Sequence, residues 1–133
     1  MNIEAFLLCD AATDQHGKLN VLGAFDNIFA KQIPATHPAC AVAARIRFDR
    51  IEEGEHKVSI LIIDEDGNPI GPKLDGSVNV RFKEKMDSLV TNLILNIQGL
   101  KFEKFGQYRI DLAIDGEIKA ELPLRLTELP QKV

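Results

Sequence analysis

The segment QYRIDLAIDGEIKAELPLRL, residues 107–126, decides the fold class. Apolar and polar side chains alternate on both sides of its Asp115-Gly116 pair, which is the period-two pattern of half-buried β-strands. Asp-Gly accepts the positive φ angles that a two-residue hairpin turn needs. The segment therefore predicts two antiparallel strands, 107–114 and 117–126, joined by a tight turn.

The same alternation recurs along the chain, and no segment keeps the 3.6-residue period of a helix. Seven further strands are predicted, at 3–12, 19–25, 28–33, 40–49, 57–63, 77–83 and 88–98. At most one short helical turn is expected, near 83–87 or 101–105. We therefore expect an all-β fold: a two-layer antiparallel β-sandwich, immunoglobulin-like or Greek-key, with eight or nine strands in a single domain over residues 1–133.

Two residues near the C-terminus sharpen the expected topology. Gly106-x-Tyr108, at the entrance to the penultimate strand, resembles the tyrosine corner of immunoglobulin-like sandwiches, in which the phenol hydroxyl bonds to upstream backbone. A lone tyrosine on an inner strand face is the alternative. Because proline cannot donate to a strand ladder, Pro123 should lie at a sheet edge, at a bulge, or with its nitrogen toward solvent.

Composition excludes several classes of protein. The chain has 133 residues, 45% of them hydrophobic, and a net charge of −4. A chain of this size buries about two-thirds of its unfolded surface, so a core can form without disulfides or metal. The acidic balance and the lack of tryptophan argue against a nucleic-acid partner.

The chain is expected to be cytoplasmic. Glu4 stands where a secretory signal needs a basic residue, and no apolar run approaches the ~20 residues of a membrane span. In that compartment Cys9 and Cys40, both within apolar segments, should be buried free thiols.

No motif of an enzyme is present. The chain lacks G-x-S-x-G, H-E-x-x-H and the Gly-rich phosphate loops, so no catalytic residue, cofactor or resident metal is expected. His37-x-x-Cys40 is the nearest approach to a metal-ligand pair, and a structural zinc site normally takes four such ligands.

An acidic turn at 64–68, Asp-Glu-Asp-Gly-Asn, resembles the start of a calcium loop. Pro69 stands where the helix–loop–helix calcium site needs glycine, and Asp75 where it needs a longer glutamate. A solvated turn is the better interpretation. A calcium or anionic-lipid module similar to C2 domains stays open as an alternative function, since calcium sites between β-loops are less demanding.

A further alternative is a small-molecule-binding domain or enzyme with a pocket at one end of the sandwich. Asp10 interrupts an apolar strand, and His37 and His56 lie in connecting segments. A carboxylate and an imidazole that meet in a cleft would be a candidate site.

Four apolar residues, Leu61, Ile63, Val90 and Ile94, fall opposite the core set of their strands. A two-layer sandwich buries one face of each sheet, so apolar residues on outer faces predict a covering segment, a partner or a second copy of the chain. Residues 26–38 are the predicted cover. A homodimer or a protein partner bound through an outer sheet face is the predicted assembly.

The stretches GKLNVLGAFDNIF, residues 17–29, and IPATHP, residues 33–38, resemble the N-terminal signature of a family of small uncharacterised bacterial proteins, a domain of unknown function. The resemblance implies one small β-sandwich-like domain without an assigned activity, and it carries over no catalytic residue. The expected function is accordingly that of a non-enzymatic cytoplasmic interaction or assembly module.

Overall fold

The structure, a computed structural model, describes residues 1–130 and is all-β. Nine strands and one short 3₁₀ turn lie within that range. Their bounds are β1 Asn2–Gln15, β2 Lys18–Ala24, β3 Asn27–Ala30, β4 Ala35–Asp49, β5 Gly54–Asp64, β6 Leu74–Val80, β7 Ser88–Phe102, β8 Gly106–Ile114 and β9 Glu117–Glu128, with the 3₁₀ turn at Arg50–Glu52. No helix in this range is long and apolar enough to cross a membrane.

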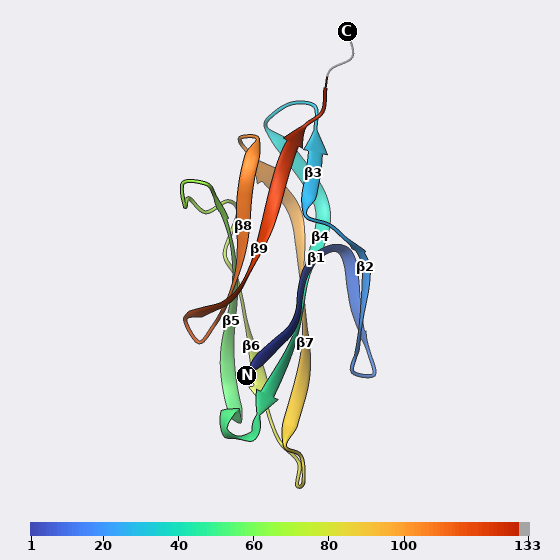
Figure 1. The fold of residues 1–133 in the computed structure, drawn as a ribbon, viewed down its shortest axis with the longest axis vertical. Coiled ribbons are helices and arrows are strands. Elements are labelled where there is room, and N and C mark those ends of the chain that lie inside the picture. Colours follow the sequence, from blue (N-terminus) through green and yellow to red (C-terminus); the bar gives the residue numbers. More distant parts are fainter. Residues whose placement is uncertain (131–133) are drawn as a thin grey trace.

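The strands form two sheets (Figure 1). The four-strand sheet has the order β2-β1-β4-β7, and the five-strand sheet has the order β3-β9-β8-β5-β6. Pairing is antiparallel except between β3 and β9, which run parallel. At this parallel pair the Thr127 hydroxyl donates to Asn27 Oδ1 at 2.7 Å, so residues 100 positions apart in the chain are joined.

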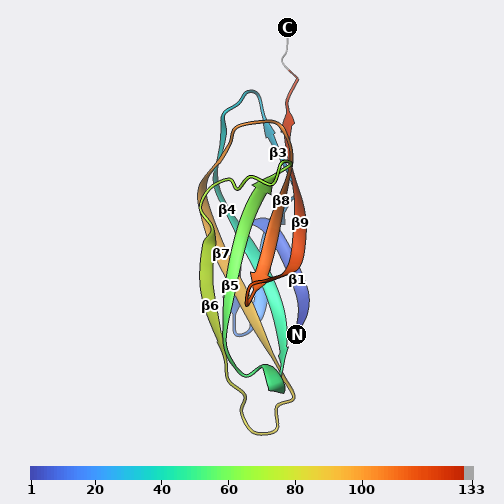
Figure 2. The same cartoon turned by 90° about the vertical axis from the view of Figure 1, so that its left-hand side faces the viewer.

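The core lies between the two sheets, where the inward sets predicted from the alternation meet. Phe48 and Phe102 of the four-strand sheet are fully buried, as are Ile110 and Leu112 of the five-strand sheet. Figure 2 looks onto the five-strand sheet, with the four-strand sheet behind it and β6 and β7 at one margin. Burying each large aliphatic or aromatic side chain contributes about 1.5–3 kcal/mol, and this inner layer is what holds the sheets together.

The structure has a strand at each predicted place, although their bounds differ. The strands expected at 28–33 and 77–83 end earlier, at Ala30 and Val80, and several others are longer than expected. The strand expected at 40–49 begins at Ala35, and the strand expected at 88–98 continues to Phe102. The single helical turn lies at Arg50–Glu52, so its predicted places near 83–87 and 101–105 were wrong. At this turn the Asp49 backbone N–H donates to the Glu52 carboxylate at 2.8 Å, which is a capping contact. The alternation of apolar and polar residues gives no sign of such a contact.

Pro123 lies in an interior strand of its sheet, yet it faces no partner on one side. β9 pairs with β8 along its length, whereas the four-residue β3 pairs only with residues 125–128. Pro123 therefore occupies the part of β9 where no ladder bond is needed on the far side, which is the physical condition that proline requires.

Tyr108 makes the backbone contact expected of it. Its hydroxyl donates to the carbonyl oxygen of Lys104 at 2.5 Å, and its ring meets Phe102 edge-on with centroids 4.9 Å apart. This contact ties the turn before β8 to the core beneath it.

Candidate functional site

The outer face of the four-strand sheet is covered by the chain's own β1–β2 hairpin. β1 pairs with β4 only as far as Cys9 and then diverges, pairing with β2 through residues 9–15. The turn of this hairpin returns to the sheet, because Arg45 Nη1 of β4 and Asn92 Nδ2 of β7 both donate to the Gly17 carbonyl oxygen at 3.1 Å. The predicted cover, residues 26–38, was therefore wrong.

Beneath the hairpin lies a second apolar cluster, separate from the main core. Cys9, Ala41 and Ala43 are fully buried there, and Ile94 packs against them together with hairpin residues Ala12, Leu19 and Val21. Small side chains on β4 let the hairpin backbone approach closely. One of the four unexplained apolar residues, Ile94, is thus accounted for within the chain.

Both cysteines are free and buried, as predicted. Burial raises the pKa of the Cys40 thiol to about 11 and also raises the pKa of Cys9. Cys9 Sγ donates to the Ala41 carbonyl oxygen at 3.5 Å. Because the thiolate is the reactive form, both groups should be inert in the folded protein.

The four apolar candidates do not form one patch. Val90 and Ile94 lie on β7 of the four-strand sheet, while Leu61 and Ile63 lie on β5 of the five-strand sheet. In each pair the side chains lie opposite the inward set of their strand, so the two pairs face away from each other. A single interface cannot contain all four.

Of the two strands that carry these apolar residues, β7 lies at the edge of its sheet and β5 does not. β7 is the last strand of its sheet, and along its 15 residues it pairs with β4 alone among the described strands. Its inward residues Leu93 and Leu95 are only half-buried, whereas their β4 neighbours Ala44 and Val42 are 0% and 2% exposed. The core is therefore closed over β4 and left incomplete along β7.

This edge lacks the usual protection against strand pairing. From Ser88 to Leu100 there is no charged residue and no proline, and only Gly99, with a φ of +65°, interrupts the strand near its end. Exposed edges are normally short, charged, bulged or covered. The uncharged run was visible in the sequence, but which strand ends a sheet was not.

Leu61 and Ile63 flank an ion pair on the outer face of the five-strand sheet. Leu61 lies opposite Asp111 and Ile63 opposite Arg109 in the β5–β8 ladder. Asp111 is only 5% exposed and accepts two bonds from Arg109, at 2.7 Å to Nε and 3.0 Å to Nη2. This two-pronged contact satisfies the buried carboxylate, so a structural role explains it fully.

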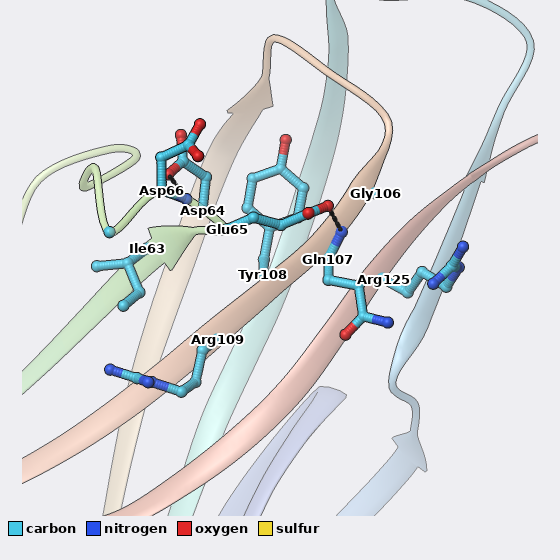
Figure 3. A pocket seen from close by; sticks show the side chains of 10 residues that line it. Ile63, Asp64, Glu65, Asp66, Gly106, Gln107, Tyr108, Arg109 and Arg125 are labelled. Carbon is cyan, nitrogen blue, oxygen red and sulfur yellow. Dashed lines mark hydrogen bonds between the residues drawn. The ribbon is translucent and has the colours of Figure 1, made fainter.

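A shallow cavity of about 820 Å³ opens beside this pair, at the acidic turn (Figure 3). The Glu65 carboxylate accepts the Gln107 backbone N–H at 3.0 Å across it. In Figure 3 the Arg109 and Arg125 side chains extend to opposite sides of the cavity. It therefore lacks the convergent polar groups that define a small-molecule site.

The acidic turn itself is saturated by the protein's own donors. Asn68 and Asp66 donate their backbone N–H groups to Asp64 Oδ1 at 2.9 and 3.0 Å, and these bonds, with Lys104 nearby, hold the pKa of Asp64 below its usual value. Lys104 Nζ lies 2.9 Å from Asp66 and 3.4 Å from Asp64. An ammonium thus stands where a calcium ion would need to bind, and this arrangement gives the calcium alternative no support.

Asp10 and His37 come together, and His56 does not join them. The first two line a cavity of about 450 Å³ with Gly23, Phe25 and Phe29. Gly23 has a φ of +66°, and a Cβ there would lie 2.5 Å from Asp10 Oδ2. A glycine at this position therefore leaves the space that the Asp10 carboxylate occupies. Apart from Asp10, the residues that line the cavity belong to the two stretches that carry the family resemblance.

His56 lies instead between the 3₁₀ turn and the β8–β9 turn. Nε2 lies 2.5 Å from the Glu52 carbonyl oxygen and Nδ1 lies 2.7 Å from Asp115 Oδ2. Both partners accept, so the form with a proton on each nitrogen is favoured. The Glu52 carbonyl first, and then Asp115, accordingly raise the pKa of His56.

We expect this contact to make stability depend on pH. Since the folded pKa is raised above the ordinary value of 6.5, the stabilisation is fully present below that value and is lost as pH rises through the folded pKa. Between about pH 6 and pH 8 the free energy of unfolding of the wild type should fall by at most about 1 kcal/mol more than that of His56→Gln. Denaturant unfolding across this range measures the difference.

His16→Asn is the matched control for that experiment. His16 is exposed in the β1–β2 turn at a φ of 52°, a conformation that asparagine tolerates. The pH dependence of this variant should equal that of the wild type. Equal slopes for the wild type and His56→Gln would contradict the prediction.

Within residues 1–130 no three His, Cys, Asp or Glu side chains are arranged to hold a metal ion. The fold and these surfaces define an all-β protein of two sheets, with a long, uncharged edge strand, β7, in one of them. The chain belongs to the family of unknown function DUF6941, whose sequence model matches residues 4–127. The resemblance to a family of unknown function is therefore confirmed. No curated protein matches the chain.

Proposed function

We propose that this protein is a non-enzymatic, cytoplasmic interaction module that binds a partner chain by accepting a strand on the free edge of β7. In this proposal residues 1–133 form a single domain with the topology of an immunoglobulin-like sandwich. The observation that carries the proposal is the long, uncharged, half-open edge between Ser88 and Gln98. Addition of an extended segment to such an edge is a common mode of protein recognition.

The strand order supports the immunoglobulin-like topology. In that fold the strands A, B, E and D form one sheet, C, F and G form the other, and a tyrosine corner marks the start of strand F. Tyr108 at the start of β8 makes β8 the counterpart of strand F, and β7 then corresponds to strand E. The β1-β4-β7 order matches A, B and E. The missing neighbour is strand D, which would lie against the free edge of β7.

The other edges of the two sheets are better protected, which favours β7 as the binding edge. β3 has only four residues, and β6 carries Asp75 and Gly76 within its seven. In β2 the penultimate residue, Gly23, lies in the left-handed region. Val90 belongs to the proposed surface, whereas Ile94 packs beneath the hairpin, and Leu61 and Ile63 lie on the other sheet.

Amide exchange measured by NMR tests the proposal, with a synthetic peptide of residues 88–98 carrying lysine tails as the probe. Two results support it: the outward amides of β7 are protected in the free protein, or they exchange freely and become protected when the peptide is added. Free exchange that the peptide does not change would overturn it. A peptide with the same composition in scrambled order is the control.

A further inference from the structure

We propose that the strand received by the β7 edge is β7 of a second copy of this chain, antiparallel to the first and related to it by a two-fold axis at Leu93. This inference rests on the proposed function, because it names the partner of the same edge. The two four-strand sheets then become one continuous sheet of eight strands.

The inner face of β7 is suited to this pairing. With the axis at Leu93, that residue meets its own copy, Thr91 meets Leu95, and Leu89 meets Ile97. These are the inward residues of the strand, and of them Leu89, Leu93 and Leu95 are half-buried against the core in the single chain. Each inward side chain therefore gains an apolar or β-branched neighbour, the kind of cross-strand pair that stabilises a sheet.

Charge favours a second copy over an arbitrary partner. A two-fold axis places the residue on the axis opposite its own copy and every other residue opposite a different residue of the same strand, so a charge on the strand has to find its counter-charge within that strand. The stretch from Ser88 to Leu100 has no charge at all, and the flanking Asp87 and Lys101 lie beyond it. Self-pairing therefore has no like-charge cost along its whole length.

The extent of the neutral run sets the register. Ser88–Gln98 is centred on Leu93, and beyond Gln98 the positive φ of Gly99 shifts the inward positions to Leu100 and Phe102. At about 3.4 Å per residue the paired segment spans roughly 37 Å. On the outer face this register brings Val90 opposite Asn96 of the second copy, clear of the contact between Asn92 and the hairpin.

Opposite-charge variants of these two positions test the pairing directly. Light scattering over a wide concentration range should give the wild type a mass of twice 14.8 kDa. The double variants Val90→Lys with Asn96→Lys, and Val90→Glu with Asn96→Glu, each place like charges opposite one another at two points. Each should dissociate, with the dimer Kd raised at least about tenfold. An equimolar mixture of the two should form dimers again.

The matched control places lysines on β6, an edge strand of the other sheet. Ser77→Lys with Asn79→Lys adds the same charge to the exposed face of β6 and should leave the dimer intact. Circular dichroism of each variant should show the β-sheet spectrum of the wild type. Dimers that persist in both charged variants, or a mixture that stays monomeric, would overturn the pairing.

A monomeric wild type also overturns self-pairing, and the peptide experiment then separates this inference from the proposed function. If the peptide of residues 88–98 still protects the β7 amides of that monomer, the edge accepts a strand and only the identity of the partner is wrong. If the peptide has no effect, both fail.

Discussion

Replacement of Phe102 by alanine should remove about 3–5 kcal/mol from the free energy of unfolding. Phe102 is 0% exposed, and its ring meets Tyr108 edge-on where the turn before β8 closes over the core. The surrounding strands are held by their ladders and cannot collapse to fill the space, so the loss includes a cavity as well as the missing burial. Urea unfolding at one fixed protein concentration measures the change.

Phe29→Ala is the control for this experiment. Phe29 is the same residue type, but it is 57% exposed on β3 and leaves the inner layer intact when removed. Its free energy of unfolding should stay within about 0.5 kcal/mol of the wild type. Similar losses for the two variants would show that the layer between the sheets is not the core of the protein.

Ala43→Leu should detach the β1–β2 hairpin and expose Cys9. Ala43 is fully buried beneath the hairpin, and a leucine there has no space unless the hairpin moves outward. Overpacking of this kind costs about 1–3 kcal/mol. Labelling of the native protein with a thiol reagent, followed by peptide mapping, should show Cys9 unreactive in the wild type and reactive in the variant.

Ala39→Leu controls for the change of residue on the same strand. Ala39 lies on the same face of β4 but is exposed, so its side chain can be enlarged without displacing the hairpin. Cys9 should remain unlabelled in this variant. Cys40, which lies in the main core, should remain unlabelled in both, and its modification would indicate general unfolding instead of local opening.

The period-two pattern was sufficient to predict the nine strands and most inward faces from residue 40 onward, because the buried side of a strand carries the apolar residues. Ile118 is an exception: it was assigned to the inner face and is 54% exposed, next to the register shift between Leu112 and Ala113. The same argument led to the inward Tyr108 and the buried thiols. It could not reveal that residues 10–24 fold back over the sheet. The hairpin is itself an alternating pair of strands, and its place is decided by Arg45 and Asn92 bonding to Gly17, contacts between residues 28 and 75 positions apart.

The candidate surface was only partly predictable for a related reason. Val90 and Ile94 were recognised as outward apolar residues, but strand order is a property of long-range pairing and does not appear in local periodicity. The Asp10 and His37 cavity forms at the chain's crossing from one sheet to the other, and His56 is drawn away by Glu52 and Asp115. These partners lie on separate elements and share no spacing in the chain.

The parallel pairing of β3 with β9 has a consequence for how the chain folds. The ladder partners of β3 lie 98 residues further on, so β3 stays unpaired until the last strand has been made. Closing so long a loop costs chain entropy before any contact repays it, and folds dominated by such distant contacts fold slowly. During synthesis β3 is therefore the third strand to leave the ribosome, yet it is among the last strands to pair.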